Sequence, residues 1–297
     1  MSMQNFTIDE ARHILAWQYE MGADEALLDR PASKTADSFI TGRSDDRSTD
    51  QPKDSVDRET VAVSVPPSVP HPSADAAAPQ HERAMHQQAM HEQAMQGASA
   101  LSHFTDLDGL RDGLLALDNC ALKHTASNLS FADGNPGADL MIVGEIPGRD
   151  EDRIGVPFAG VAGQLLDRML ASFGRDRSSS YLVNLLPWRP PGNRTPTDEE
   201  LALLLPWLYR HIQLAKPSVI LLLGGMPCRI VFDQKDGILK CRGRWQNIDF
   251  GDGIGRPVIA SLHPAYLLRS PAQKRLAFDD LINLAGRLGT SAGPVQG

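Results

Sequence analysis

From residue 101 onward, short apolar runs bounded by glycine or proline alternate with amphipathic stretches of helical length. This alternation is typical of an α/β domain, in which helices cover both faces of a mostly parallel sheet. The pattern predicts strands at 140–143, 181–185, 218–223 and 257–262, and helices at 161–173, 198–214, 226–232 and about 272–288. We therefore expect residues 101–297 to form a three-layer αβα sandwich.

The first 100 residues have a different composition. Residues 7–29 begin with a capping-box pattern and keep the spacing of an amphipathic helix, so we expect a short helical segment within residues 1–30. Residues 31–100 are rich in Pro, Ser, Asp, Ala and Gln, and this composition predicts a disordered linker.

A near-repeat lies within this predicted linker, where 84–88 (Ala-Met-His-Gln-Gln) is followed by 89–93 (Ala-Met-His-Glu-Gln). Its histidines, His86 and His91, could bind a metal ion. The tract could also be a low-complexity, helix-prone segment, and we favour that interpretation.

The acidic charge of the chain is concentrated in the N-terminal segment. The formal net charge is -8, and residues 1–100 hold 8 Lys and Arg against 16 Asp and Glu. Residues 101–297 hold 21 of each kind, so that part of the chain has no net charge. A neutral domain can still carry a local basic face, so the charge does not exclude a nucleic-acid partner.

Cysteine content and hydropathy restrict the type of protein further. The three cysteines, Cys120, Cys228 and Cys241, form no CxxC pair, so we expect reduced thiols rather than a disulfide framework or a zinc site. No apolar stretch approaches the roughly 20 residues of a membrane helix, and Asp9 and Glu10 are unlike the start of a signal peptide. We expect a cytoplasmic, nucleoid-associated protein.

Chemically informative residues follow three of the predicted strands. The loop Gly144-Glu145-Ile146-Pro147-Gly148 comes after the first strand, Asn184 ends the second, and His263 follows the last. Ligands of open α/β sheets bind beyond the carboxyl ends of the strands, so these residues should share one edge. Two more segments accompany them: Phe158 before a glycine-flanked helix start, and the run Arg189 to Arg194.

In this order, the segments resemble those of the family 4 uracil-DNA glycosylases, the thermostable-type branch of the uracil-DNA glycosylase superfamily. The resemblance covers residues 118–288, and Ile146 replaces the central alanine of the family. It implies a DNA-repair hydrolase that cleaves the N-glycosidic bond of uracil and leaves an abasic site. It also implies a monomer that acts on single- or double-stranded DNA.

The residue types suit this reaction. Glu145 and His263 are the predicted catalytic residues, for the cationic sugar and for uracil O2 respectively. The predicted substrate-binding residues are Gly144, Gly148, Glu151, Phe158 and Asn184. Among these, the Phe158 ring could stack on a flipped uracil and the Asn184 amide could pair with its N3-H and O4.

The resemblance also indicates residues that contact DNA. Leu267, Leu268 and Arg269 match the loop that enters DNA in the superfamily, and Asn193 and Arg194 are candidate backbone contacts. Arg242, Arg244 and Lys274 are weaker candidates for phosphate contact. A protein partner could bind the segment 7–29.

One property of the family should be absent. Family 4 enzymes hold a 4Fe-4S cluster through four cysteines, and the matching positions here are Leu117, Cys120, Trp188 and Leu204. One thiolate cannot hold a cubane that needs four ligands. We therefore predict no cluster, no other metal and no cofactor, with apolar packing in that space.

Alternatives to an active uracil glycosylase remain open at this point. The protein could act mainly as an interaction module, with the segment 7–29 docking on a partner and the fold kept as a scaffold, although intact Glu145, Asn184 and His263 disfavour this. The chain could bind or trap uracil-containing DNA without turnover, although Gly224-Gly225 leads directly to Met226-Pro227-Cys228 without an inserted basic loop. It could also act on another deaminated base, because Ile146 and the Glu151 region border the pocket. The sequence leaves base specificity, strand preference and the role of the N-terminal segment undecided.

Overall fold

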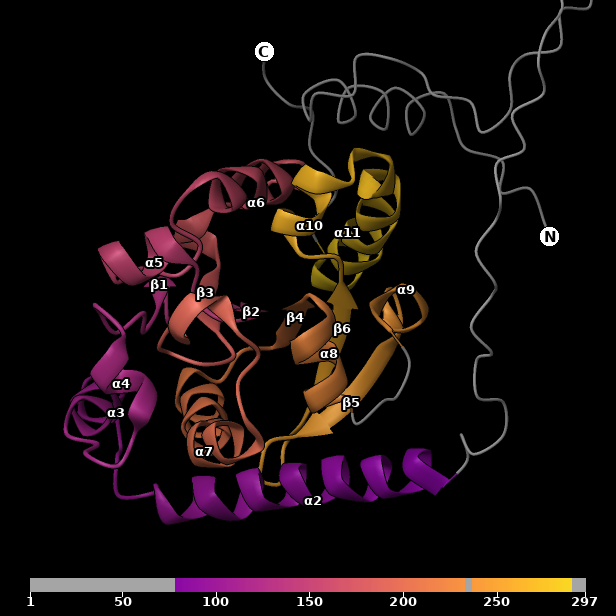
Figure 1. Ribbon diagram of the computed structural model, residues 1–297. Coiled ribbons are helices and arrows are strands. Elements are labelled where there is room, and N and C mark those ends of the chain that lie inside the picture. Colours follow the sequence, from indigo (N-terminus) through magenta and orange to yellow (C-terminus); the bar gives the residue numbers. More distant parts are fainter. Residues whose placement is uncertain (1–77, 233–236, 290–297) are drawn as a thin grey trace, which may run out of the picture. The chain divides into compact units, whose positions relative to one another are not determined.

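The computed structural model describes residues 78–232 and 237–289 (Figure 1). The helix expected at 7–29 and the first part (31–77) of the linker expected at 31–100 lie outside these residues. The described part contains no helix that is both long enough and apolar enough to span a membrane.

A six-stranded sheet in the order β1-β3-β2-β4-β6-β5 forms the centre of the domain (Figure 1). Its four inner strands are parallel, while the edge strands β1 and β5 pair antiparallel. The strands are β1 (Asp133–Gly134), β2 (Leu140–Gly144), β3 (Tyr181–Asn184), β4 (Val219–Leu223), β5 (Trp245–Asp249) and β6 (Gly255–Ser261). The four predicted strands are confirmed as the inner ones, and the two edge strands were not predicted.

Helices cover both faces of the sheet, because alternate residues of each strand point to opposite sides. Leu140 and Ile142 of β2 belong to one buried cluster, and Met141 and Val143 belong to the other. The first cluster is completed by α6 (Val161–Ala171), α10 (Pro264–Arg269) and α11 (Lys274–Leu288). The second is completed by α3 (Leu107–Leu115), α4 (Ala121–Thr125), α7 (Asp198–Ala215), α8 (Gly225–Val231) and α9 (Ile238–Cys241). The expected three-layer αβα architecture is confirmed.

The prediction of a disordered linker is wrong for residues 78–100, which form the helix α2 (Ala78–Ala100). Figure 1 shows α2 lying along α7. Met90, Ala94 and Ala98 recur every four residues, so they share one face of the helix, and all three are buried. Tertiary packing of these few residues orders a segment whose composition suggested disorder.

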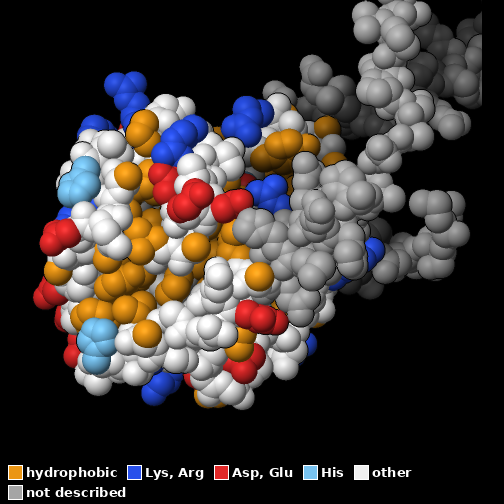
Figure 2. All heavy atoms as spheres, turned by 60° about the horizontal axis from the view of Figure 1, so that its bottom comes forward, with side chains coloured by type: hydrophobic (Ala, Val, Ile, Leu, Met, Phe, Trp, Pro, Cys, Tyr) orange, Lys and Arg blue, Asp and Glu red, His pale blue; other side chains and the backbone are white. Residues whose placement is uncertain are grey.

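Small residues allow α2 and α7 to approach closely. A Cβ atom at Gly97 would lie 2.6 Å from Cγ of Pro206 in α7. His91 Nδ1 lies 2.5 Å from the hydroxyl of Tyr209. His91 thus contacts the protein core, in agreement with the helix-prone interpretation of the near-repeat. Figure 2 brings the side that carries α2 forward and shows hydrophobic side chains gathered there among scattered charges.

Candidate active site

The carboxyl ends of β2, β3 and β6 meet at one edge of the sheet, as predicted. Gly144 pairs with Asn184 in register, so the loop after β2 begins beside the end of β3. A cavity of about 630 Å³ opens at this edge. Its lining includes Glu145, Gly148, Glu151, His263 and Arg269. Residues from distant parts of the sequence therefore surround one cavity.

Glu145 is held against the loop that follows β4. Its Oε1 accepts a hydrogen bond of 3.3 Å from the backbone N–H of Met226. Gly224, with φ of +109°, makes this approach possible, since a Cβ atom there would lie only 2.4 Å from Oε1 of Glu145. A glycine is thus required beside the carboxylate for two reasons, space and backbone conformation.

His263 is the N-cap of α10, and this position fixes its tautomer. Its Nδ1 accepts a hydrogen bond of 3.1 Å from the backbone N–H of Ala265. The ring proton must then lie on Nε2, which is left as the donor. Burial lowers the pKa of His263, and the nearby charge of Glu145 acts in the opposite direction. The imidazole is therefore neutral near pH 7, with Nε2–H available.

Phe158 and Asn184 lie beside the cavity, packed against Gly144. A Cβ atom at Gly144 would lie 2.6 Å from both Oδ1 of Asn184 and Cζ of Phe158. The Phe158 ring is stacked on the His263 ring, with centroids 5.8 Å apart and an interplanar angle of 19°. Phe158 and Asn184 are both buried, and neither of these two residues lines the cavity itself.

The Glu151 carboxylate connects the loop, the ring and the amide. Its Oε2 accepts from the backbone N–H of Gly148 at 2.5 Å, and its Oε1 accepts from the backbone N–H of Phe158 and from Nδ2 of Asn184. Burial raises the pKa of Glu151, while these N–H donors lower it. Because a carboxylate only accepts, Asn184 must present its Nδ2 to Glu151. The amide orientation is thereby determined.

The predicted DNA-inserting residues differ in exposure. Leu267 is fully buried in the core between the sheet and α6, so its predicted insertion into DNA is wrong for this conformation. Leu268 is 39% exposed, and the neighbouring Arg269 is exposed and lines the cavity. Helical periodicity explains the difference, because successive residues of α10 point to different sides.

Arg194 is exposed and is engaged in an ion pair at the protein surface. Its guanidinium makes a bidentate ion pair with Glu200, at 2.8 and 2.6 Å, and Glu200 also caps the start of α7. Its predicted phosphate contact would require this pair to open. Asn193, exposed at the cavity wall, accepts from Arg189 at 2.7 Å. Arg242 is likewise paired, to Asp280, at the start of the segment leading to β5.

The four cluster positions lie in apolar surroundings. Cys120, Trp188 and Leu204 are buried in the same hydrophobic cluster, and Leu117 packs against it. The cavity that borders Leu204 measures about 20 Å³, which is room for about one water molecule. Within the described residues, no three His, Cys, Asp or Glu side chains are grouped to hold a metal. The residues present do not fit an iron-sulfur cluster.

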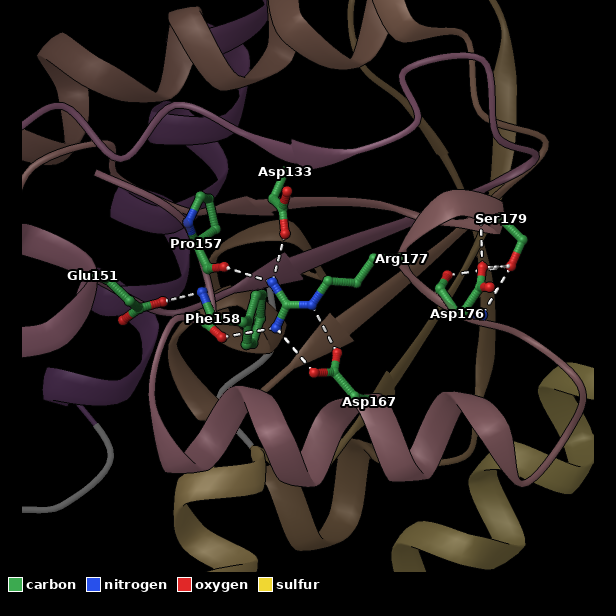
Figure 3. Close-up of polar contacts among 8 residues, drawn as sticks. All are labelled: Asp133, Glu151, Pro157, Phe158, Asp167, Asp176, Arg177 and Ser179. Atoms are coloured by element: carbon green, nitrogen blue, oxygen red, sulfur yellow. Dashed lines mark hydrogen bonds and ion pairs between the residues drawn. The ribbon is translucent and has the colours of Figure 1, made fainter. Parts of the chain in front are cut away.

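Arg177 is a site residue that the sequence did not indicate. It lies in the 3-10 turn η1 (Arg177–Ser179) and contacts the backbone of Phe158, 19 residues earlier (Figure 3). An arginine in a short polar turn gives no local sign of this role. Only the arrangement of η1 against the start of α6 reveals it.

Comparison with known proteins agrees with this arrangement. The sequence model described as the uracil DNA glycosylase superfamily matches residues 131–285, just over half of the chain. A type-4 uracil-DNA glycosylase of Archaeoglobus fulgidus is 38% identical over 170 residues, which cover 56% of this chain and 84% of the relative. The type-4 enzymes of Thermotoga maritima and Pyrobaculum aerophilum are 38% and 35% identical, over 54% and 56% of this chain and 84% and 87% of theirs.

Proposed function

The chain belongs to the uracil DNA glycosylase superfamily, and we propose that the cavity between Glu145 and His263 excises uracil from DNA. The reaction is hydrolysis of the N-glycosidic bond, which leaves an abasic site for base-excision repair. One observation carries the assignment: Glu145, Phe158, Asn184 and His263, from four separate segments, meet at one sheet edge.

Uracil is recognised by the amide that Glu151 orients. With one N–H of Asn184 committed to Glu151, the other N–H donates to uracil O4, and Oδ1 accepts from uracil N3–H. Cytosine presents a donor and an acceptor in the reverse order, so both contacts become repulsive. Flipping the base costs about a few kcal/mol, which stacking on Phe158 helps to offset.

His263 stabilises the leaving base. As the glycosidic bond breaks, the electron pair moves onto the uracil ring and charge accumulates on O2. Nε2–H of the neutral His263 donates to this oxygen, in a site where burial strengthens the interaction. One positioned donor of this kind contributes about 3 to 4 kcal/mol to the transition state.

Glu145 acts on the sugar side of the bond. The carboxylate, fixed through Met226 and Gly224, stabilises the positive charge that develops at the deoxyribose carbon. It also orients the water molecule that adds there, in the role of a general base. The leaving uracil takes the electron pair, and the new bond to oxygen completes the hydrolysis.

The enzyme works without an iron-sulfur cluster. The site chemistry described above involves side chains and water alone, and Cys120 is the one cysteine among the four positions of the family. Trp188 and Leu204, both buried, contribute to the core in that region instead. DNA is held by the exposed Leu268 and Arg269 next to the cavity.

A strand-cleavage assay tests the proposal. The full chain is incubated with an oligonucleotide that contains one uracil, and alkali then cuts the strand at any abasic site. We expect released uracil and many turnovers, with no cleavage of the matching thymine oligonucleotide. A complex that resists denaturation would instead indicate a trapping protein, and cleavage at another deaminated base would indicate altered specificity. Any result without release of uracil over many turnovers would contradict the proposal.

A further inference from the structure

Arg177 binds the backbone carbonyls on both sides of the Phe158 Cα atom. Its Nη2 donates to the carbonyl of Phe158 at 2.9 Å, and its Nη1 is 3.4 Å from the carbonyl of Pro157 (Figure 3). Two carboxylates fix the guanidinium itself: Asp167 of α6 accepts from Nε at 2.7 Å, and Asp133 of β1 accepts from Nη1 at 2.5 Å. A planar donor is thus aimed at two carbonyls.

Phe158 needs such support because of its conformation. Its φ of +54° lies in the left-handed region, which bulky side chains rarely adopt. Both main-chain polar groups of Phe158 are bound, the N–H by Glu151 and the carbonyl by Arg177. Gly163 also makes room, since a Cβ atom there would lie 1.5 Å from the Phe158 carbonyl oxygen.

We infer that Arg177 is a positioning residue for base recognition, acting through Phe158. It keeps Phe158 in the left-handed conformation that places the aromatic ring against Gly144 and His263. Loss of the guanidinium allows the backbone to relax, and the ring then no longer presents its face to the base. This inference rests on the proposed function, because it assumes that Phe158 stacks on uracil.

The chain provides a matched control for a purely structural arginine. Arg175, two residues earlier, makes a bidentate ion pair with Asp139 at 2.6 and 2.9 Å and donates to the Ser179 carbonyl at 3.1 Å. Its side chain is more buried than that of Arg177, with 11% exposed against 28%. Its hydrogen bonds go to Asp139 and Ser179, away from Phe158.

The experiment compares Arg177→Met with Arg175→Met, each alone and combined with Phe158→Ala. Three quantities are measured: the single-turnover rate on uracil-DNA, inhibition by free uracil, and binding to DNA with a tetrahydrofuran abasic analogue. The analogue has no base, so its binding does not use the aromatic ring. Thermal unfolding monitors folding, and Arg177→Lys provides a variant that keeps the charge but lacks the planar fork.

We expect Arg177→Met to lower the single-turnover rate about 100-fold, the typical effect of a misplacement near 1 Å. Inhibition by free uracil should weaken about tenfold, in the range of lost base–aromatic stacking, with unchanged binding of the abasic analogue. Arg177→Lys should show smaller losses of the same kind. In the Phe158→Ala background, Arg177→Met should add almost nothing.

Two results would overturn the inference. Arg177→Met could affect rate and uracil inhibition no more than Arg175→Met does, or its losses could add fully to those of Phe158→Ala. If Phe158→Ala alone leaves rate and uracil inhibition unchanged, the proposed recognition of uracil fails instead. The two failures are therefore distinguishable.

Discussion

Nδ2 of Asn184 lies 3.3 Å from Oε1 of Glu151, so a partly buried carboxylate determines which end of the amide faces the neighbouring cavity. Glu151 also accepts from the backbone of the loop after β2 and from the backbone of Phe158. The Glu151 side chain therefore accepts hydrogen bonds from the loop after β2, from the backbone of Phe158 and from the Asn184 amide. Its effect on the reaction is indirect, through the groups that it orients.

Replacement of this acceptor should alter base discrimination. Glu151→Gln can donate as well as accept, so the Asn184 amide is free to rotate. We expect kcat/KM on uracil to fall at least tenfold, because a hydrogen bond to a charged group contributes about 1.5 to 3 kcal/mol. The ratio of cytosine to uracil excision should rise. Asp118→Asn, at a 99% exposed carboxylate, is the control, and an unchanged ratio in Glu151→Gln would count against the orienting role.

His263→Ala should lower kcat by about 10² to 10³, the usual cost of removing one positioned oxyanion donor. His124→Ala, at an exposed histidine that contacts the Asp118 carbonyl, should leave kcat unchanged. Steady-state kinetics on a uracil oligonucleotide measures both. Equal rates for His263→Ala and the parent chain would contradict the assignment.

The pH profile provides a second test of His263. Burial lowers its pKa below the ordinary value of 6.5, so the neutral donor persists as pH falls through 6.5 and is lost only below the lowered pKa. We expect kcat to show no decrease attributable to His263 between pH 7.5 and 6.5. A decrease with a midpoint at or above 6.5 that disappears in His263→Ala would show that the imidazole titrates normally.

The purified protein should be colourless and lack stoichiometric iron, as measured by visible absorbance and metal analysis. Trp188 is 2% exposed, and Trp188→Ala should lower the free energy of unfolding by about 3 to 5 kcal/mol through loss of buried packing. Trp245→Ala, at a partly exposed tryptophan on edge strand β5, should cost less. A brown protein with four irons per chain would refute the prediction that no iron-sulfur cluster is bound.

The α2–α7 contact makes Gly97 intolerant of side chains. Gly97→Val would place atoms within 2.6 Å of the Pro206 ring, and we expect it to lower the free energy of unfolding by about 1 to 3 kcal/mol, as overpacking does. Gln96→Val, on the exposed side of α2, introduces the same side chain without this clash. Denaturant titration compares the two, and equal stabilities would mean that α2 does not pack as described.

Local patterns were sufficient for the inner sheet and its helices. Strands such as β2 and β4 are continuous apolar runs between glycines or polar residues. Such runs are typical of parallel strands that are buried on both faces of a sheet. The order of strands also placed Glu145, Asn184 and His263 at one edge, because parallel strands end on the same side. The predicted strands and helices depend only on residues that are close in sequence, and the shared edge follows from the position of each site residue at the end of its own strand.

The missed features depend on contacts between distant segments. The two-residue strand β1 exists because Asp133 and Gly134 pair with the start of β3. Leu267 and Leu268 are identical in type, and only the packing of α10 separates a core residue from an exposed one. The approach of Arg177 to Phe158 likewise depends on the position of η1 against α6.

The packing of α2 also determines how far this chain can be shortened. The family match starts at residue 131, yet Met90, Ala94 and Ala98 fill part of the same core as Tyr209 and Phe250. A protein that started at residue 131 would lack α2. The apolar side chains that α2 covers, such as Tyr209 and Phe250, would then face water, and exposed apolar surfaces promote aggregation. The autonomous folding unit of this enzyme is therefore larger than the segment 131–285 that matches its family, and its N-terminal limit lies ahead of Met90.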